Sequence, residues 1–251
     1  MSKNSTIEWT DHTFNPWWGC TKISPACDNC YAERFANRFG VGWGQGKQRR
    51  YASEATWRAP YIWDSQAAKA NRRARVFTAS MADVFDHEVH DKWRHRLFFL
   101  IRSTPNLDWQ ILTKRPKLML EWADKHGWPT NAWAGTTIEN QAMMKARGQW
   151  IEKMKAHATI TFLSCEPLLG KITPTCRVDW VIAGGETGNH ARKMRIDWVR
   201  DLLNTCIIFD IPFFFKQWGE YDMCGHKVGR IAAGRLLDGR EWNQFPIVKK
   251  G

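Results

Sequence analysis

The chain has 251 residues, a formal net charge of +12 and 43% hydrophobic residues, with 16 Trp and 13 Phe. This length supports one well-packed core and is the usual size of an α/β barrel domain. Mixed charge and abundant aromatic residues exclude disorder as the main state. No apolar run approaches the ~20 residues of a membrane helix. Residues 1–5 lack the apolar stretch of a signal peptide, so we expect a cytoplasmic protein with no membrane partner.

Short apolar runs alternate with helical stretches along the whole chain, which indicates βαβ units and a parallel sheet. The predicted strands are one near Thr13–Trp18, then Arg75–Ser80, Asp108–Thr113, Asn131–Thr137, Thr159–Cys165, Val178–Gly184 and Ile211–Lys216. The predicted helices are Cys27–Phe39, Trp63–Arg73, Asp91–Ser103, Pro116–His126, Ile138–Ala156 and Asp197–Phe209. Six or seven such units, with no dinucleotide-type glycine-rich turn after the first strand, favour a TIM-like partial or full (β/α) barrel.

Two segments stand apart from this alternation. Residues 40–60 combine four glycines with a run of basic residues and are predicted to form a mobile basic insertion. Residues 219–251 contain several glycine turns and predict a hairpin-rich extension packed on the barrel. We therefore expect a barrel over residues 1–218, with the extension at 219–251.

Each predicted strand from the second onward ends in a polar cluster, and in a barrel these ends form one rim. One such end is ordinary, because helix caps and turns need Ser, Thr and Asp. Six in succession, three of them with a Glu, are hard to explain by capping alone and predict a working site. The clusters are Thr78–Ser80 with Asp83, Thr113–Arg115, Thr136–Thr137 with Glu139, Ser164–Pro167, Gly184–Glu186 and Lys216–Trp218.

Three of the seven cysteines lie within eleven residues, at Cys20, Cys27 and Cys30. The odd total and the absence of an export signal disfavour a disulfide framework. The C-x6-C-x2-C spacing on a Gly- and Pro-containing loop predicts a metal or cluster site. Zinc needs a fourth ligand, which His12, Cys224 or His226 would supply. A [4Fe–4S] cluster held by three cysteines leaves one iron open for catalysis.

A cysteine triad after the first strand of a parallel barrel resembles the radical S-adenosylmethionine enzymes. The segment C-D-N-C-Y-A-E (27–33) is similar to the spore photoproduct lyase branch, which repairs a thymine lesion. Nearly the whole chain resembles a phage and bacterial family with the same cysteine spacing. Matching segments include W-T-D-H-T-F-N-P-W-W-G-C (9–20), L-T-K-R-P (112–116), A-G-T-T-I-E-N (134–140), L-S-C-E-P-L-L-G (163–170), V-I-A-G-G-E-T-G (181–188), K-Q-W-G (216–219) and L-D-G-R (237–240). The superfamily's usual spacing is C-x3-C-x2-C, and its usual aromatic residue before the last cysteine is Asn29 here.

The resemblance implies a [4Fe–4S] cluster on the three cysteines, S-adenosylmethionine as cofactor, and an electron donor such as flavodoxin or ferredoxin. It implies that Ser80, Asp83 and Glu139 accept from the methionyl ammonium and that Lys114 pairs with its carboxylate. Gly184 and Gly185, which lack side chains, would let the backbone approach the cofactor closely. Glu166 or Glu186 would accept hydrogen bonds from its ribose. Arg192, Lys216 and Gln217 would face substrate. Cys165 is either a hydrogen-atom donor or a small buried residue.

Charge is the main sequence clue to the substrate. Basic residues concentrate between Lys47 and Arg75 and are interleaved with Trp43, Tyr51 and Trp57, which suits phosphate contacts and base stacking. The plainer interpretation makes Trp57 and Trp63 core anchors and the arginines a solvated surface. We expect an enzyme that modifies or repairs a nucleobase in nucleic acid or a nucleotide. The alternatives are a nucleic-acid-binding module with structural zinc, and a radical enzyme acting on a peptide or small metabolite.

Overall fold

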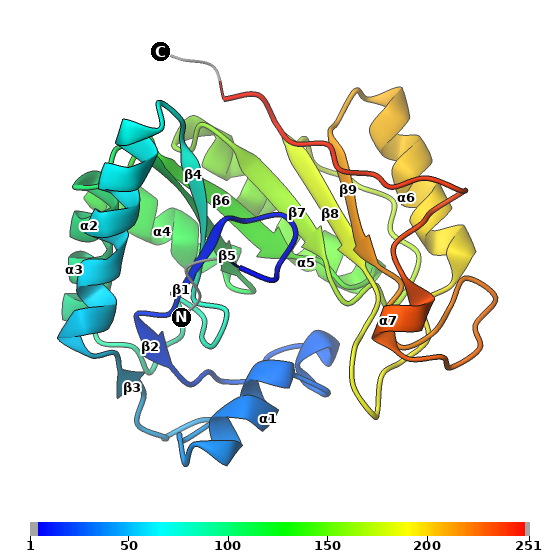
Figure 1. Ribbon diagram of the computed structural model, residues 1–251, viewed down its shortest axis with the longest axis horizontal. Coiled ribbons are helices and arrows are strands. Elements are labelled where there is room, and N and C mark those ends of the chain that lie inside the picture. The colour runs from blue at the N-terminus through cyan, green and yellow to red at the C-terminus, as the bar shows by residue number, and fades with distance from the viewer. Residues whose placement is uncertain (1–4, 249–251) are drawn as a thin grey trace. The chain divides into compact units, whose positions relative to one another are not determined.

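A computed structural model describes residues 5–248 of the chain, which alternates strands and helices (Figure 1). The strands are β1 (His12–Phe14), β2 (Trp17–Trp18), β3 (Arg50–Tyr51), β4 (Ala74–Thr78), β5 (Leu107–Thr113), β6 (Ala132–Thr137), β7 (Thr161–Cys165), β8 (Trp180–Gly184) and β9 (Phe213–Gln217). The α-helices are α1 (Tyr31–Arg38), α2 (Glu54–Lys69), α3 (Asp91–Arg102), α4 (Pro116–His126), α5 (Gln141–Lys153), α6 (Ile196–Ile208) and α7 (Arg230–Ala233). Two 3₁₀ turns, η1 (Pro25–Cys27) and η2 (Met154–Ala156), complete the elements. None of the helices described is long and apolar enough to cross a membrane.

Seven strands form one hydrogen-bonded sheet in the order β1-β4-β5-β6-β7-β8-β9. Strand β1 pairs in parallel with β4, and β4 with β5; β7 pairs in parallel with β8, and β8 with β9. The strands are buried on both sides, as expected for parallel strands that helices cover. The α/β class predicted from sequence, a partial (β/α) barrel of successive βα units, is confirmed.

The chain divides into two compact units, described separately below. The first comprises Met1–Ile23, Ala32–Ala134 and His157–Thr159, and the second comprises Ser24–Tyr31, Gly135–Ala156 and Ile160–Gly251. The sequence-based division at residue 218 is a different partition and stays a prediction.

In the first unit, α2 packs on β4 and β5, and its tryptophans belong to the core. Trp57 and Trp63 are buried, with Trp57 edge-on to Phe14 and Trp63 stacked on His12 at a ring separation of 4.4 Å. Trp57 therefore acts as a core anchor, and the suggestion that it stacks on nucleotide bases is wrong.

Helix α2 also begins nine residues before its predicted start. Ser53 caps the helix by accepting a hydrogen bond from the backbone N–H of Thr56, and Pro60 lies inside the helix. Residues 54–60 of the predicted basic insertion are thus helical, while Arg50 and Tyr51 form β3, which pairs antiparallel with β2. Because Trp57, Pro60 and Trp63 are all buried at helical spacing, packing outweighs the cost of an internal proline.

In the second unit, β8 and β9 run beside the chain that follows Trp218. The N–H of Phe215 donates to the carbonyl of Trp242, and Phe214 bridges to Asn243. Trp180 of β8 donates its indole N–H to the carbonyl of Gln244. The C-terminal segment thus packs on β8 and β9, with short antiparallel bridges at Tyr221–Lys227 and Leu237–Arg240.

Candidate functional site

The cysteine loop leaves β2 through a glycine that no other residue could replace without strain. Gly19 has φ +104°, a region that favours glycine, and a Cβ there would lie 2.9 Å from the carbonyl oxygen of Gly42. Its N–H donates to the carbonyl of Met81 at 3.0 Å. This turn delivers Cys20 to the segment that follows β4.

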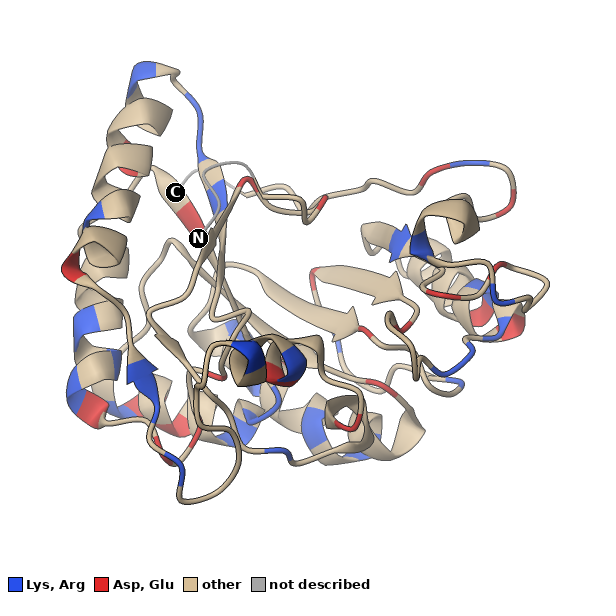
Figure 2. Cartoon of the chain, turned by 60° about the horizontal axis from the view of Figure 1, so that its bottom comes forward, with Lys and Arg blue, Asp and Glu red and all other residues tan. Residues whose placement is uncertain are grey.

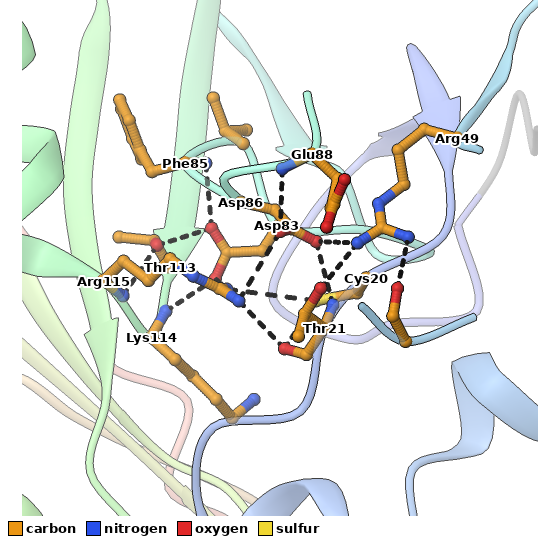
Figure 3. Close-up of polar contacts among 12 residues, drawn as sticks. Cys20, Thr21, Arg49, Asp83, Phe85, Asp86, Glu88, Thr113, Lys114 and Arg115 are labelled. Atoms are coloured by element: carbon orange, nitrogen blue, oxygen red, sulfur yellow. Dashed lines mark hydrogen bonds and ion pairs between the residues drawn. The ribbon is translucent and has the colours of Figure 1, made fainter. Parts of the chain in front are cut away.

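Asp83 is a buried carboxylate that joins the ends of β4 and β5 in the first unit (Figure 3). One of its oxygens accepts from the Thr113 hydroxyl at 2.6 Å and from the N–H of Phe85 at 2.9 Å. The other accepts from the N–H of Lys114 and from Nη1 of Arg115, both at 3.0 Å. Four donors therefore fix Asp83 as a structural hub of the predicted rim.

Arg115 connects that hub to the cysteine loop. It lies at the N-cap of α4, and its Nη1 is 4.0 Å from Sγ of Cys20 while its Nη2 donates to the carbonyl of Thr21 at 2.9 Å. Its Nε is buried without a hydrogen-bond partner among residues 5–248. Burial, reinforced by the nearby charge of Asp83, raises the pKa of the Cys20 thiol to about 12 despite the opposing effect of Arg115.

A second buried ion pair fixes the next residue of the loop. Arg49 donates from Nη2 to Oδ2 of Asp86 at 2.7 Å, and both side chains are fully buried. The same Asp86 oxygen accepts from the N–H of Thr21 at 2.8 Å, and Arg49 also donates to the Thr21 hydroxyl at 2.6 Å. Sequence reasoning assigned no site role to Arg49, Asp86 or Arg115, although Arg115 belongs to the polar cluster Thr113–Arg115 and to the quoted segment L-T-K-R-P.

Two predicted cofactor contacts of the first unit differ in whether their side chains already bond to other residues. The Ser80 hydroxyl is hydrogen-bonded to the side-chain amide of Asn15, which also accepts from the N–H of Met81 at 2.9 Å. The Lys114 ammonium forms no hydrogen bond or ion pair within the described chain, and Figure 3 shows its side chain leaving the Asp83–Arg115 network. Lys114 is thus a cation close enough to affect the Cys20 thiol whose charge no described residue pairs.

In the second unit, Glu139 holds the turn that carries Cys27. Its side chain is fully buried, pairs with Nη1 of Arg147 at 2.9 Å, and accepts from the N–H of Ala26 at 3.3 Å. Cys27 is buried, with Sγ 3.9 Å from the Ser24 hydroxyl. Glu139 therefore positions η1, and its two oxygens already have partners.

Glu186 and Arg192 hold the residues between Cys27 and Cys30. Glu186 accepts from Nδ2 of Asn29 at 3.0 Å and from Nε and Nη2 of Arg192 at 2.9 and 2.5 Å. Arg192 also donates to the carbonyl of Pro25 at 2.9 Å and to Asp28 at 3.2 Å. Although burial alone would raise it, these hydrogen bonds lower the pKa of Glu186, which is an anion at neutral pH.

Glu166 and Lys216 form a separate pair at the ends of β7 and β9. Lys216 Nζ lies 3.1 Å from Oε1 of Glu166, and a Cβ on Gly184 would lie 2.7 Å from that same oxygen. A Cβ on Gly185 would lie 1.8 Å from the carbonyl oxygen of Trp218, so β8 needs glycine where it meets the end of β9. Gln217 is buried in β9, its carbonyl accepting from the N–H of Gly185.

Cys165 is fully buried at the end of β7, and burial raises the pKa of its thiol well above the usual value. It therefore exists as a neutral thiol, which suits packing and hydrogen-atom donation alike.

The predicted residues thus gather in groups. Cys20 shares a network with Asp83 and the backbone N–H of Lys114. The Cys27–Cys30 segment rests on Glu139, Glu186 and Arg192, while Glu166, Gly184 and Lys216 form a third group.

The donor set of the loop fits an iron–sulfur cluster in its chemistry, because three free cysteines lie on one short segment. As the side chains stand, no three His, Cys, Asp or Glu residues within 5–248 are grouped closely enough to hold a metal ion. His12, Cys224 and His226, the predicted fourth ligands for zinc, therefore also belong to no such group. His12 stacks on Trp63, and His226 is paired with Asp222.

A model of the family described as "Protein of unknown function (DUF5131)" matches residues 4–246. No curated protein matches the chain. Among solved structures, the chain is similar to a cysteine-to-serine variant of spore photoproduct lyase, with 12% identity and a TM-score of 0.49 over 73% of this chain and 58% of that one. A second variant, with bound AdoMet and dinucleoside spore photoproduct, gives 11% identity and a TM-score of 0.46 over 78% and 60%. The chain therefore covers less than two thirds of those proteins.

Proposed function

The chain belongs to the DUF5131 family, and we propose that it is an iron–sulfur, S-adenosylmethionine-dependent radical enzyme that modifies or repairs a nucleobase in nucleic acid or a nucleotide. The observation that carries the proposal is the three-cysteine loop, whose first thiol lies on a buried network at the ends of two parallel strands. The carboxyl ends of parallel strands are where barrel enzymes place their sites.

Cys20, Cys27 and Cys30 would hold the cluster, and S-adenosylmethionine would bind beside it. When bound, the cluster and cofactor together would supply one-electron radical chemistry that removes a hydrogen atom from substrate. Metal ligation requires thiolates, so binding displaces the proton that Cys20 holds at neutral pH.

The protein's own contribution is to position the loop and the cofactor. Arg115 and Asp86 hold Thr21, the residue after Cys20, while Arg192 holds Pro25 and Asp28 on either side of Cys27. The Lys114 ammonium has no hydrogen-bond or ion-pair partner among residues 5–248 and would pair with the methionyl carboxylate. Because Asp83 and Glu139 are both saturated by buried donors, their role is to hold this frame in place.

The test is iron content and cofactor cleavage in protein purified and reconstituted without oxygen. We expect brown protein with about four irons per chain, and 5′-deoxyadenosine on addition of dithionite and S-adenosylmethionine. Replacing Cys20, Cys27 or Cys30 by Ala should abolish both, whereas Cys224→Ala, which removes an exposed cysteine, should change neither. Colourless protein with about one zinc would instead identify a structural zinc module.

Lys114→Met tests the carboxylate contact separately from the cluster. Loss of a charged hydrogen bond to a ligand costs about 1.5–3 kcal/mol, which corresponds to a roughly 10- to 150-fold rise in the Kd for S-adenosylmethionine at unchanged iron content. The matched control is Lys117→Met, at an exposed lysine on α4. Equal affinity in the two variants would remove Lys114 from the cofactor site.

A further inference from the structure

Three aromatic side chains of the first unit form a cluster that is partly open to solvent. Trp18 of β2 lies 5.7 Å from Phe35 of α1 and 5.8 Å from Phe39, and the two Phe rings are 5.0 Å apart. Phe35 is 42% exposed and Phe39 55%. Most large aromatic residues of this chain are buried, so a group of three at the surface marks a contact site.

The segment that carries two of these rings is basic. Residues 34–53 contain no Asp or Glu, and four of their cations are exposed, namely Arg34, Arg38, Lys47 and Arg50. Arg34 and Arg38 share α1 with Phe35, and Arg50 is the cross-strand partner of Trp18. The two acids that flank this segment are paired elsewhere, Glu33 with Lys22 at 2.6 Å and Glu54 with Arg96 at 2.5 Å, and Glu88 accepts from the N–H of Gly46 at 2.9 Å. Figure 2 shows the Lys and Arg positions in blue.

We propose that Trp18, Phe35 and Phe39 stack on unpaired bases of a single-stranded nucleic acid, whose phosphates contact the four exposed cations. This deepens the proposed function by naming the form of its nucleic-acid substrate. Base–aromatic stacking needs exposed π-faces, which a single strand offers and a duplex conceals. Phosphate contacts need cations that water can reach, and these four side chains satisfy that requirement.

Several residues that the sequence favoured for nucleotide binding are buried or paired within the protein. Trp57 is buried, and Tyr51 packs on Trp57 and Trp93. Arg49 is buried against Asp86, and Arg73 pairs with Asp108 at 2.8 Å. These residues are committed to the fold, whereas the aromatic cluster of β2 and α1 is not enclosed.

The experiment measures binding of a fluorescein-labelled oligothymidylate of about 12 nucleotides by anisotropy, beside oligouridylate and a duplex of equal length. Each of Phe35→Ala and Phe39→Ala should weaken single-strand binding about 5-fold or more. The control is Phe99→Ala, which removes an equally accessible ring (66% exposed) from α3.

Arg38→Gln and Arg50→Gln should each reduce the slope of log affinity against log salt by about 0.7, and Lys69→Gln on α2 should not. Unchanged circular-dichroism melting will show that the variants are folded.

The proposal is supported if single strands bind more tightly than duplex and if both Phe variants lose this binding. Whether oligothymidylate, oligouridylate or both bind will show whether the strand is DNA, RNA or either. Duplex binding of equal strength, or wild-type affinity in both Phe variants, overturns it. Binding to phosphatidylserine vesicles in place of the oligomers also overturns it. The assay needs no iron, S-adenosylmethionine or reductant, so intact strand binding by a chain that takes up no cluster would refute the proposed chemistry and leave this inference standing.

Discussion

Asp83 is the residue whose loss should most disturb the cysteine loop, and Asp83→Asn tests that role with almost no change in shape. The side chains of Asp83 and Arg115 are 7% and 5% exposed. An asparagine can keep the oxygen that accepts from Thr113 and Phe85. Its amide nitrogen then faces the N–H of Lys114 and the guanidinium of Arg115, so two donors lose their acceptor.

The expected cost follows from those two losses. A buried ion pair broken on one side costs about 3–5 kcal/mol, and an unsatisfied buried backbone N–H costs about 1–3 kcal/mol. Arg115 keeps the carbonyl of Thr21 and lies 3.7 Å from Asp86, which offsets part of the loss. We therefore expect Asp83→Asn to lower the free energy of unfolding by about 4 kcal/mol. In a chain of this size the melting temperature should fall by about 10 °C.

The assay is thermal unfolding followed by circular dichroism and by tryptophan fluorescence. The matched control is Glu121→Gln on α4, which breaks the exposed pair with Lys117 and should cost less than about 0.5 kcal/mol. The double variant Asp83→Asn/Arg115→Gln should lose less than the sum of its parts, because the unpaired charge is gone. A loss of less than about 1 kcal/mol for Asp83→Asn would refute the argument that this ion pair organises the strand ends.

Two further substitutions test the second unit. Glu186→Gln should destabilise the chain most at neutral pH. The pKa of Glu186 in the folded state lies below its ordinary value of 4.5. The carboxylate therefore contributes its full stabilisation above pH 4.5, and this stabilisation is lost as the pH falls through the folded pKa. Melting curves from pH 7 to about pH 3 should show the gap to wild type closing, and Glu241→Gln, at an exposed pair, serves as the control; a pH-independent gap would contradict the linkage. Gly185→Ala should cost about 3 kcal/mol in urea unfolding, because its Cβ meets backbone at 1.8 Å, while Gly170→Ala, with its nearest neighbour at 3.3 Å, should cost less than about 1 kcal/mol. Equal losses for the two Gly variants would show that β8 can shift to make room.

Elements with strong local signals were predictable from the sequence. Helix α4 runs over Pro116–His126, as predicted, since proline at its first position and Gly127 after it mark both ends. Strand β5 differs from its prediction by one residue, because its run of apolar residues is bounded by polar ones. The polar clusters at the strand ends were also predictable, because each follows directly after an apolar run. A parallel sheet then places these ends at the same edge.

Elements decided by distant contacts were not predictable. The helix predicted over Cys27–Phe39 is a 3₁₀ turn over Pro25–Cys27 and a helix over Tyr31–Arg38. The break falls at Asp28 and Asn29, whose side chains bond to Arg192 and Glu186 more than 150 residues later. Local periodicity carries no information about such partners.

The same limit applies to the site, and it changes how the polar strand ends are interpreted. The resemblance found in the sequence implies that Asp83, Glu139 and Glu186 contact a cofactor directly. In the structure each carboxylate accepts from a buried or half-buried arginine, Arg115, Arg147 or Arg192, and each of these ion pairs is also bonded to the cysteine segment between Thr21 and Asn29.

A loop that carries three thiols has little apolar surface with which to fix itself, so ion pairs that bond to its backbone provide the necessary rigidity. The strand-end carboxylates therefore position the loop, and any effect on the proposed reaction would pass through it. Lys114, whose ammonium pairs with none of residues 5–248, is then the side chain that we propose for contact with a bound cofactor.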